Sequence, residues 1–155
     1  DNCESSNYNN PMNTRGKIDS TVKEHLADLQ QIFRDSGNVV SAYLFGSVAE
    51  GVENRYSDVD IAVRLKPGLS PMEKHRIRMH LIGTLEGIFG KDVDVVVLDD
   101  ASLKMLHQVF SRGISIYTPN DRQEEEFRLK MQKAYFDFQY YLEKEHRDLR
   151  LFYGC

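Results

Sequence analysis

Two aspartates one residue apart, at the start of an apolar run, constrain this chain more than any other feature. The stretch is LFGSVAEGVENRYSDVDIAV, residues 44–63, in which Asp58 and Asp60 lead into the run. Because successive side chains of a β-strand alternate between its faces, Asp58 and Asp60 point the same way and lie close together. Like charges so placed repel and disfavour each other's ionisation. We therefore expect a cation between them, and a divalent metal is the obvious candidate.

A Gly-Ser pair ends the preceding apolar run. Ten residues separate Ser47 of this pair from Asp58. The backbone N–H groups of a tight turn donate to anions, a serine hydroxyl adds another donor, and Gly46 lets a phosphate approach the backbone closely. Mg²⁺ in proteins is normally held by one or two carboxylates together with substrate phosphates. The two motifs together are typical of a nucleotidyl-transfer site.

A two-metal site needs a further carboxylate from a neighbouring strand. The run DVDVVVL, residues 92–98, predicts such a strand and offers Asp92 and Asp94 on one face. Asp92 lies at the start of the strand, where pairing frays, whereas Asp94 lies one step further in. We predict Asp58, Asp60 and Asp94 as the catalytic and metal-binding residues, with Asp92 as a supporting alternative.

Hydrophobic periodicity and turn residues predict alternating helices and short strands. Helices are expected between Ile18 and Gly37, at 71–89, at about 101–112 and from about 121 onward, with strands at 39–45, 60–65, 92–98 and 114–118. This order predicts an α/β (α+β) domain, in which a small mixed β-sheet packs with helices and a long helix ends the chain. Residues 1–16 are polar and aperiodic, so we expect a flexible leader followed by a single domain over 17–155.

The second strand has one apolar face, formed by Val59, Ile61, Val63 and Leu65. We expect that face to pack on the core. The opposite face is expected to be open, and it carries Asp58, Asp60, Ala62 and Arg64.

Composition narrows the class of protein. A chain of 155 residues with 41% hydrophobic residues suits one globular domain, and a net charge of −4 argues against a general nucleic-acid binder. No apolar run approaches the ~20 residues of a membrane span, and no secretory signal is recognisable. The two cysteines, Cys3 and Cys155, have no metal-ligand spacing. We expect a cytoplasmic protein without a membrane or direct nucleic-acid partner.

Gly46-Ser47, ten residues, Asp58-Val59-Asp60 and a later strand aspartate resemble the polymerase-β-type nucleotidyltransferase superfamily, and in particular its minimal nucleotidyltransferases. The stretches VDVVVLDDAS (93–102) and VFSRGISIYTPND (109–121) resemble minimal nucleotidyltransferases that are paired with HEPN-type toxins. The resemblance implies the polymerase-β-like fold. Ser102 departs from the family pattern, in which we expect proline.

The resemblance implies a magnesium-dependent enzyme that transfers AMP from ATP to a hydroxyl and releases pyrophosphate. Asp58 and Asp60 would hold two Mg²⁺ ions, Asp94 would bind the catalytic ion and help to remove the acceptor proton, and Gly46 and Ser47 would hold the β- and γ-phosphates. The implied acceptor is a tyrosine of a helical HEPN ribonuclease toxin, for which the chain would be the antitoxin.

Other interpretations remain open. The chain could be a non-catalytic antitoxin that neutralises its partner by binding, or a small-molecule, antibiotic-type nucleotidyltransferase. The aspartate pair could be a solvated strand start, and Ser47 a helix N-cap. Arg55 and Arg64 are candidate phosphate contacts, with surface charge as the alternative.

The C-terminal helix is rich in aromatic residues. One stripe at helical spacing is expected to face the core, and it comprises Phe127, Met131, Tyr135 (or Ala134), Phe138 and Leu142. Phe136 and Tyr140 lie outside this stripe. Because aromatic residues are enriched at interfaces, we expect these two to dock a protein partner, with a broad core-facing side of the helix as the alternative.

Overall fold

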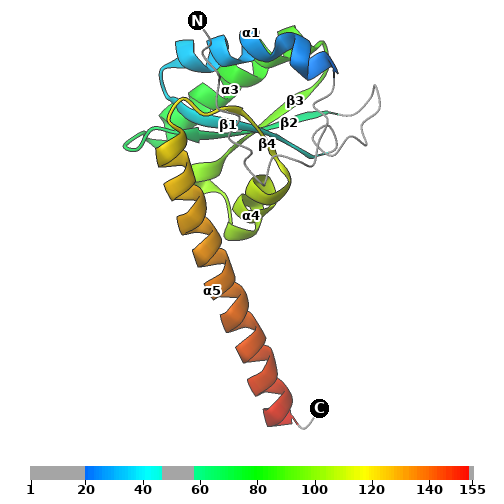
Figure 1. Ribbon diagram of the computed structural model, residues 1–155, viewed down its shortest axis with the longest axis vertical. Coiled ribbons are helices and arrows are strands. Elements are labelled where there is room, and N and C mark those ends of the chain that lie inside the picture. The colour runs from blue at the N-terminus through cyan, green and yellow to red at the C-terminus, as the bar shows by residue number, and fades with distance from the viewer. Residues whose placement is uncertain (1–19, 47–57, 154–155) are drawn as a thin grey trace, which may run out of the picture.

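The computed structural model of the chain describes residues 20–46 and 58–153. Along the chain these form α1 (Ser20–Ser36), β1 (Val39–Phe45), β2 (Val59–Leu65), α3 (Pro71–Phe89), β3 (Val93–Val97), the short 3₁₀ turn η1 (Leu98–Asp100), α4 (Leu103–Arg112), β4 (Ile114–Tyr117) and α5 (Asp121–Tyr153). The predicted order of helices and strands is confirmed (Figure 1). The expected leader, residues 1–16, lies outside the described residues.

The sheet is mixed, with strand order β3-β2-β1-β4. β2 and β3 run parallel and are joined by α3, whereas β1 pairs antiparallel with both β2 and β4. The C-terminal end of β1 and the N-terminal ends of β2 and β3 therefore meet at one edge of the sheet. In the register, Phe45 lies opposite Asp60, and Asp60 lies opposite Asp94.

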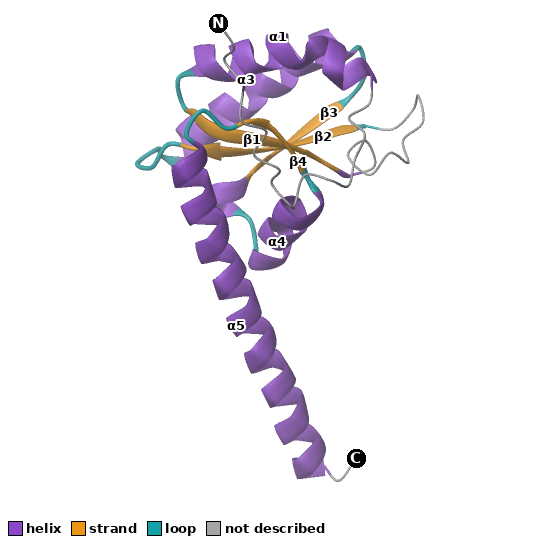
Figure 2. Ribbon diagram, viewed as in Figure 1, coloured by secondary structure: helices purple, strands orange, loops and turns teal. Residues whose placement is uncertain are grey.

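Helices α1 and α3 cover one face of the sheet (Figure 2). Their apolar sides meet the predicted apolar face of β2, where Val59, Ile61, Val63 and Leu65 are at most 1% exposed. Helix α3 begins as predicted, because Ser70 and Glu73 form a reciprocal capping box. It ends at Gly90, whose φ of 64° is left-handed.

The opposite face of β2 is not open, and this expectation was wrong. A second apolar cluster covers it, made of Tyr43, Phe45, Ala62, Leu98, Leu106, Val109 and Phe110. Helix α4 supplies the last three of these residues, and Ser102 begins that helix by accepting a hydrogen bond from Met105 N. Ser102, which stands where the family pattern has proline, is thus the N-cap of α4. The charges of Asp60 and Arg64 concealed this second core layer, because they flank the small, buried Ala62.

Helix α5 packs only at its start, and the rest projects from the domain (Figure 1). Phe127 and Met131 pack partly buried against the α4 cluster, as predicted. Phe138 and Leu142, expected in the core, are 48% and 39% exposed. Every side chain described from Phe136 to Phe152 is exposed, because α5 continues beyond the part of the domain that could cover it.

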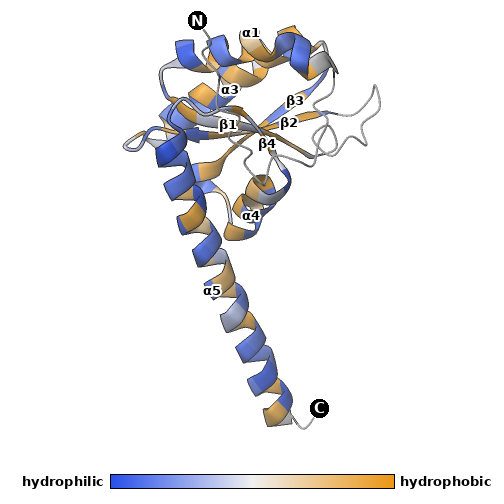
Figure 3. Ribbon diagram, viewed as in Figure 1, coloured by the Kyte–Doolittle hydropathy of each residue, from blue (hydrophilic) through white to orange (hydrophobic). Residues whose placement is uncertain are grey.

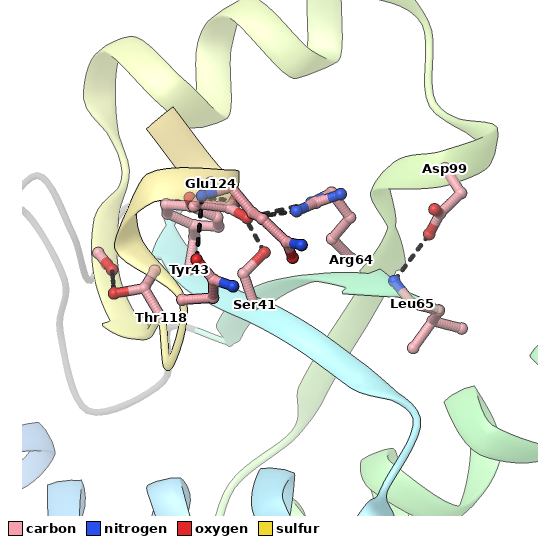
Figure 4. A network of polar contacts seen from close by, with 10 residues as sticks. Ser41, Tyr43, Arg64, Leu65, Asp99, Thr118 and Glu124 are labelled. Atoms are coloured by element: carbon pink, nitrogen blue, oxygen red, sulfur yellow. Dashed lines mark hydrogen bonds and ion pairs between the residues drawn. The ribbon is translucent and has the colours of Figure 1, made fainter. Parts of the chain in front are cut away.

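A buried carboxylate anchors the first turn of α5 to the sheet (Figure 4). Glu124 is 2% exposed and accepts hydrogen bonds from Ser41 Oγ (2.8 Å) and from the Tyr43 hydroxyl. Arg64 donates to its other oxygen through Nε (3.1 Å) and Nη2 (2.7 Å). Burial and the neighbouring Glu124 charge raise the pKa of Tyr43, so its hydroxyl stays a donor. Arg64 is therefore a structural partner of Glu124, and it is neither a phosphate contact nor a free surface charge.

Candidate active site

The three predicted aspartates lie at the sheet edge where β1 ends and β2 and β3 begin. Asp58 directly precedes β2, and Asp60 and Asp94 are register partners in the parallel pair. Neighbouring strands lie about 4.8 Å apart, so the backbones bring the two carboxylates close. Asp60 and Asp94 share the face of the sheet that α4 covers further along, and the Asp94 side chain remains 55% exposed. Substrates can therefore reach it.

Asp60 is partly buried beside two further carboxylates. Its burial, followed by the charges of Asp94 and Asp58, raises the pKa of Asp60 above its ordinary value. A carboxylate in this position is stabilised by a cation, which offsets both the lost hydration and the repulsion. Hard carboxylate oxygens are the ligands that Mg²⁺ prefers. The donor set therefore fits a divalent metal.

Gly46, which follows β1, lies so close to Asp60 that a side chain at position 46 would displace the Asp60 carboxylate. Its φ is +74°, and a Cβ built there would lie 2.3 Å from Asp60 Oδ2. Glycine is therefore favoured at position 46 for two reasons: the backbone is left-handed, and Asp60 occupies the space of a side chain. The link between the glycine motif and the aspartate motif, inferred from spacing alone, is thus a direct packing contact.

Replacing Gly46 by alanine is expected to destabilise the protein and to displace Asp60. The left-handed backbone alone costs about 1–2 kcal/mol for a residue with a Cβ, and the contact with Asp60 Oδ2 adds to this. Thermal unfolding with and without Mn²⁺ measures both effects: a lower midpoint, and a smaller rise on adding the ion.

Gly87→Ala is the matched control, because Gly87 lies in α3 and a Cβ there meets no atom within 4 Å. Alanine in a helix is favoured over glycine by about 0.8–1.0 kcal/mol, so this variant should unfold at a higher temperature. Equal shifts for the two variants would show that the Gly46 contact has no consequence.

Arg78 of α3 is a site residue that the sequence did not reveal. It reaches around the edge strand β3, where its Nε donates to Val95 O (2.6 Å) and its Nη2 donates to Asp94 Oδ1 (3.3 Å). The guanidinium thus fixes one oxygen of Asp94 and offsets part of the local negative charge. No spacing rule links a helix arginine to a strand carboxylate sixteen positions away; the β2-α3-β3 crossover brings them together.

An open groove of about 390 Å³ runs beside Asp94, between α3 and β3. Lys74, His75 and Arg78 line its helical side, and Lys74 also pairs with Asp100 at 3.2 Å. The groove therefore places basic side chains next to the carboxylate site. This arrangement suits a substrate that carries phosphate.

Not every predicted site residue is placed. Ser47 and Arg55 lie outside the described residues, so their proposed phosphate contacts stay predictions. Among residues 20–46 and 58–153, no three acidic, histidine or cysteine side chains converge as a formed metal site. The same described residues include no helix apolar and long enough to cross a membrane.

Comparison with known sequences agrees with this geometry. Residues 27–122 match the family described as Polymerase beta, Nucleotidyltransferase. The chain is also similar to the protein adenylyltransferase MntA of Shewanella oneidensis, with 31% identity over 101 residues. That alignment covers 65% of this chain and 63% of MntA, so the chain spans less than two thirds of its relative.

Comparison with solved structures extends the similarity to the fold. A toxin–antitoxin structure with AMP-PNP superposes with a TM-score of 0.65 and 28% identity, covering 80% of this chain and 97% of the other. A complex of tri-AMPylated Shewanella oneidensis HEPN toxin with MNT antitoxin gives a TM-score of 0.62 and 25% identity, covering 82% and 97%. The mixed sheet, the long C-terminal helix and the family match together confirm the resemblance seen in the sequence. The chain belongs to the polymerase-β nucleotidyltransferase family.

Proposed function

We propose that this chain is a metal-dependent protein adenylyltransferase that transfers AMP from ATP to a tyrosine of a HEPN-family toxin, and so acts as its antitoxin. The observation that carries the proposal is the meeting of Gly46, Asp60 and Asp94 at one sheet edge in a member of this family. The relative named protein adenylyltransferase, and the similar structures with AMP-PNP or an AMPylated toxin, support the substrate and the partner. ATP as substrate fits the expected cytoplasmic location.

The glycine turn holds the nucleotide. Backbone N–H groups after Gly46 and the Ser47 hydroxyl bind the β- and γ-phosphates, with Arg55 as a further contact. The contact between Gly46 and Asp60 would bring phosphates bound at this turn close to the carboxylates.

Three carboxylates would hold two Mg²⁺ ions. Asp58 and Asp60 would contribute to both, and Asp94, to whose Oδ1 Arg78 donates, would bind the catalytic one. When bound, the ions supply charge neutralisation at the phosphates and lower the pKa of the acceptor hydroxyl. The raised pKa of Asp60 supports this assignment, since the crowded carboxylates need positive charge between them.

Asp94 receives the acceptor. A tyrosine hydroxyl at its exposed side lies in line with the α-phosphorus of the bound nucleotide. The hydroxyl oxygen forms a bond to that phosphorus, the bond to pyrophosphate breaks, and the hydroxyl proton passes to Asp94. Holding the two reactants in this geometry is the main contribution of the protein, and such positioning can supply about 7–11 kcal/mol of the barrier.

The modified toxin is expected to be inactive. An adenylyl group on a tyrosine beside an RNA-cutting site adds bulk and negative charge, which repel the RNA phosphates.

A panel of acceptors tests the proposal. The purified protein is incubated with Mg²⁺ and ATP labelled on the α-phosphate, and then with the toxin or with aminoglycosides. We expect label on the toxin alone, and none from ATP labelled on the γ-phosphate. Label on an aminoglycoside would favour the small-molecule enzyme. Neutralisation without any label would favour an antitoxin that acts by binding only.

A further inference from the structure

Helix α5 carries a continuous stripe of residues spaced alternately by four and three positions. We call it the α5 stripe, and its members are Met131, Tyr135, Phe138, Leu142, Glu145 and Leu149. Met131 and Tyr135 are partly buried against α4, where His107 stacks on the Tyr135 ring with centroids 3.9 Å apart. Beyond them, Phe138, Leu142 and Leu149 are 48%, 39% and 46% exposed. The same face of the helix is thus covered in its first half and uncovered in its second.

This spacing is the one by which helices pack along a shared seam. Apolar residues every 3.5 positions on average keep one side of a helix facing a partner helix. Helix α4 is the partner helix for the first half of the α5 stripe, but α4 ends at Arg112. Apolar segments continue along α5 beyond that point (Figure 3). Large exposed apolar residues in one row mark an interaction surface.

Glu145, in the middle of the exposed stripe, argues against a second copy of this chain as occupant. A parallel pair in register places Glu145 against its own copy. An antiparallel pair centred on residue 145 also places Glu145 against Glu145 of the other copy. An antiparallel pair in which Phe138 lies opposite Leu149 places Glu145 against Leu142. Like charges at a seam repel, and a carboxylate against leucine loses its hydration without a partner. None of these three arrangements of two copies offers Glu145 an opposing cation.

We propose that the exposed part of the α5 stripe docks an amphipathic helix of the toxin, with apolar residues along the seam and a lysine or arginine opposite Glu145. The identity of the partner rests on the proposed function; the chemistry of its helix follows from the stripe. This revises the expectation that Phe136 and Tyr140 dock the partner. Both are exposed, but Tyr140 lies on the other side of α5, and the Phe136 ring meets His107 and Tyr135 edge-on, with centroids 6.2 and 6.0 Å apart.

The anchor at the base of α5 gives this docking a consequence for the active site. Glu124 bonds to β1 through Ser41 and Tyr43 and to β2 through Arg64, and these strands also carry Phe45 and Asp60 at their other ends. A toxin seated on α5 is therefore held in a fixed relation to the carboxylates.

Matched leucine pairs test the proposal. Leu142→Ser with Leu149→Ser alters the stripe, whereas Leu129→Ser with Leu151→Ser alters residues of the opposite side that are 55% and 83% exposed. Binding to the toxin is measured by calorimetry without ATP, so that the result does not depend on catalysis. The stripe pair is expected to weaken binding by at least about tenfold, and the opposite pair by much less. Glu145→Lys should also weaken binding, because it opposes the partner cation.

Three results would overturn the proposal: equal effects of the two leucine pairs, greater loss of binding with Tyr140→Ser than with the stripe pair, or no toxin binding by the unaltered chain. A fourth contradicting result could come from light scattering on the chain alone. If the unaltered chain is a dimer and the variant with Leu142→Ser and Leu149→Ser is not, a second copy occupies the stripe. Unchanged thermal unfolding of the variants confirms that they fold. Loss of AMP transfer with toxin binding intact would count against the proposed function and leave the docking surface standing.

Discussion

Asparagine in place of both Asp58 and Asp60 is expected to reduce AMP transfer by about 10³-fold or more, while the chain stays folded and still binds the toxin. The amides keep the shape of the carboxylates but supply no charge for the metal. Rates of label transfer to the toxin measure the effect. Asp28→Asn with Asp35→Asn is the control, because it makes the same charge change on exposed positions of α1.

The same variant should be more stable than the unaltered protein when no metal is present. Folding raises the pKa of Asp60. The folded protein therefore loses stability as the pH rises from the unfolded pKa of this carboxyl through its folded pKa. At neutral pH, Asp60 thus opposes folding. Asparagine removes this penalty. Adding Mg²⁺ should then raise the unfolding temperature of the unaltered protein and leave that of the variant unchanged. Transfer that persists in the variant would exclude these aspartates as the catalytic residues.

Replacing Glu124 by alanine should cost about 3–5 kcal/mol of unfolding free energy, the range typical of breaking one side of a buried ion pair. The substitution leaves the Arg64 guanidinium, with its side chain 15% exposed, without its carboxylate, and leaves the Ser41 and Tyr43 hydroxyls without an acceptor. Urea unfolding measures the loss, and the attachment of α5 to the sheet should weaken with it.

Glu126→Ala is the control for Glu124, because Glu126 lies in the same helix with its side chain 69% exposed and paired to Arg122. An exposed pair of this kind contributes about 0.3–0.5 kcal/mol. Losses of similar size for the two variants would mean that the Glu124 network does not anchor the helix.

Local chemistry made most of the fold predictable. The capping box of Ser70 and Glu73, the left-handed Gly90 and the alternation along β2 act within a few residues of one another, so each is readable from the chain. The proximity of Gly46 to Asp60 was also readable, because the motif spacing is short. The structure adds the reason, which is the contact between Gly46 and Asp60.

Features that join distant segments were not predictable in this way. Glu124 and Arg64 are 60 positions apart. The sequence therefore suggested a phosphate contact or a surface charge for Arg64, whereas its partly buried side chain pairs with Glu124. Arg78 meets Asp94 only through the β2-α3-β3 crossover. The stripe on α5 has one periodicity throughout, and nothing in that pattern distinguishes Met131, which packs on α4, from Leu142, which does not.

Mass spectrometry of the toxin, co-expressed with this chain and purified, tests most directly whether these carboxylates transfer AMP to a toxin tyrosine. With the unaltered chain, we predict a toxin heavier by one or more adenylyl groups, with peptide fragments that place them on tyrosine. With the Asp58→Asn and Asp60→Asn variant, the toxin should have its unmodified mass although the two proteins still bind. An unmodified toxin that is nevertheless neutralised by the unaltered chain, or adenylyl groups that persist with the variant, would contradict the proposed mechanism.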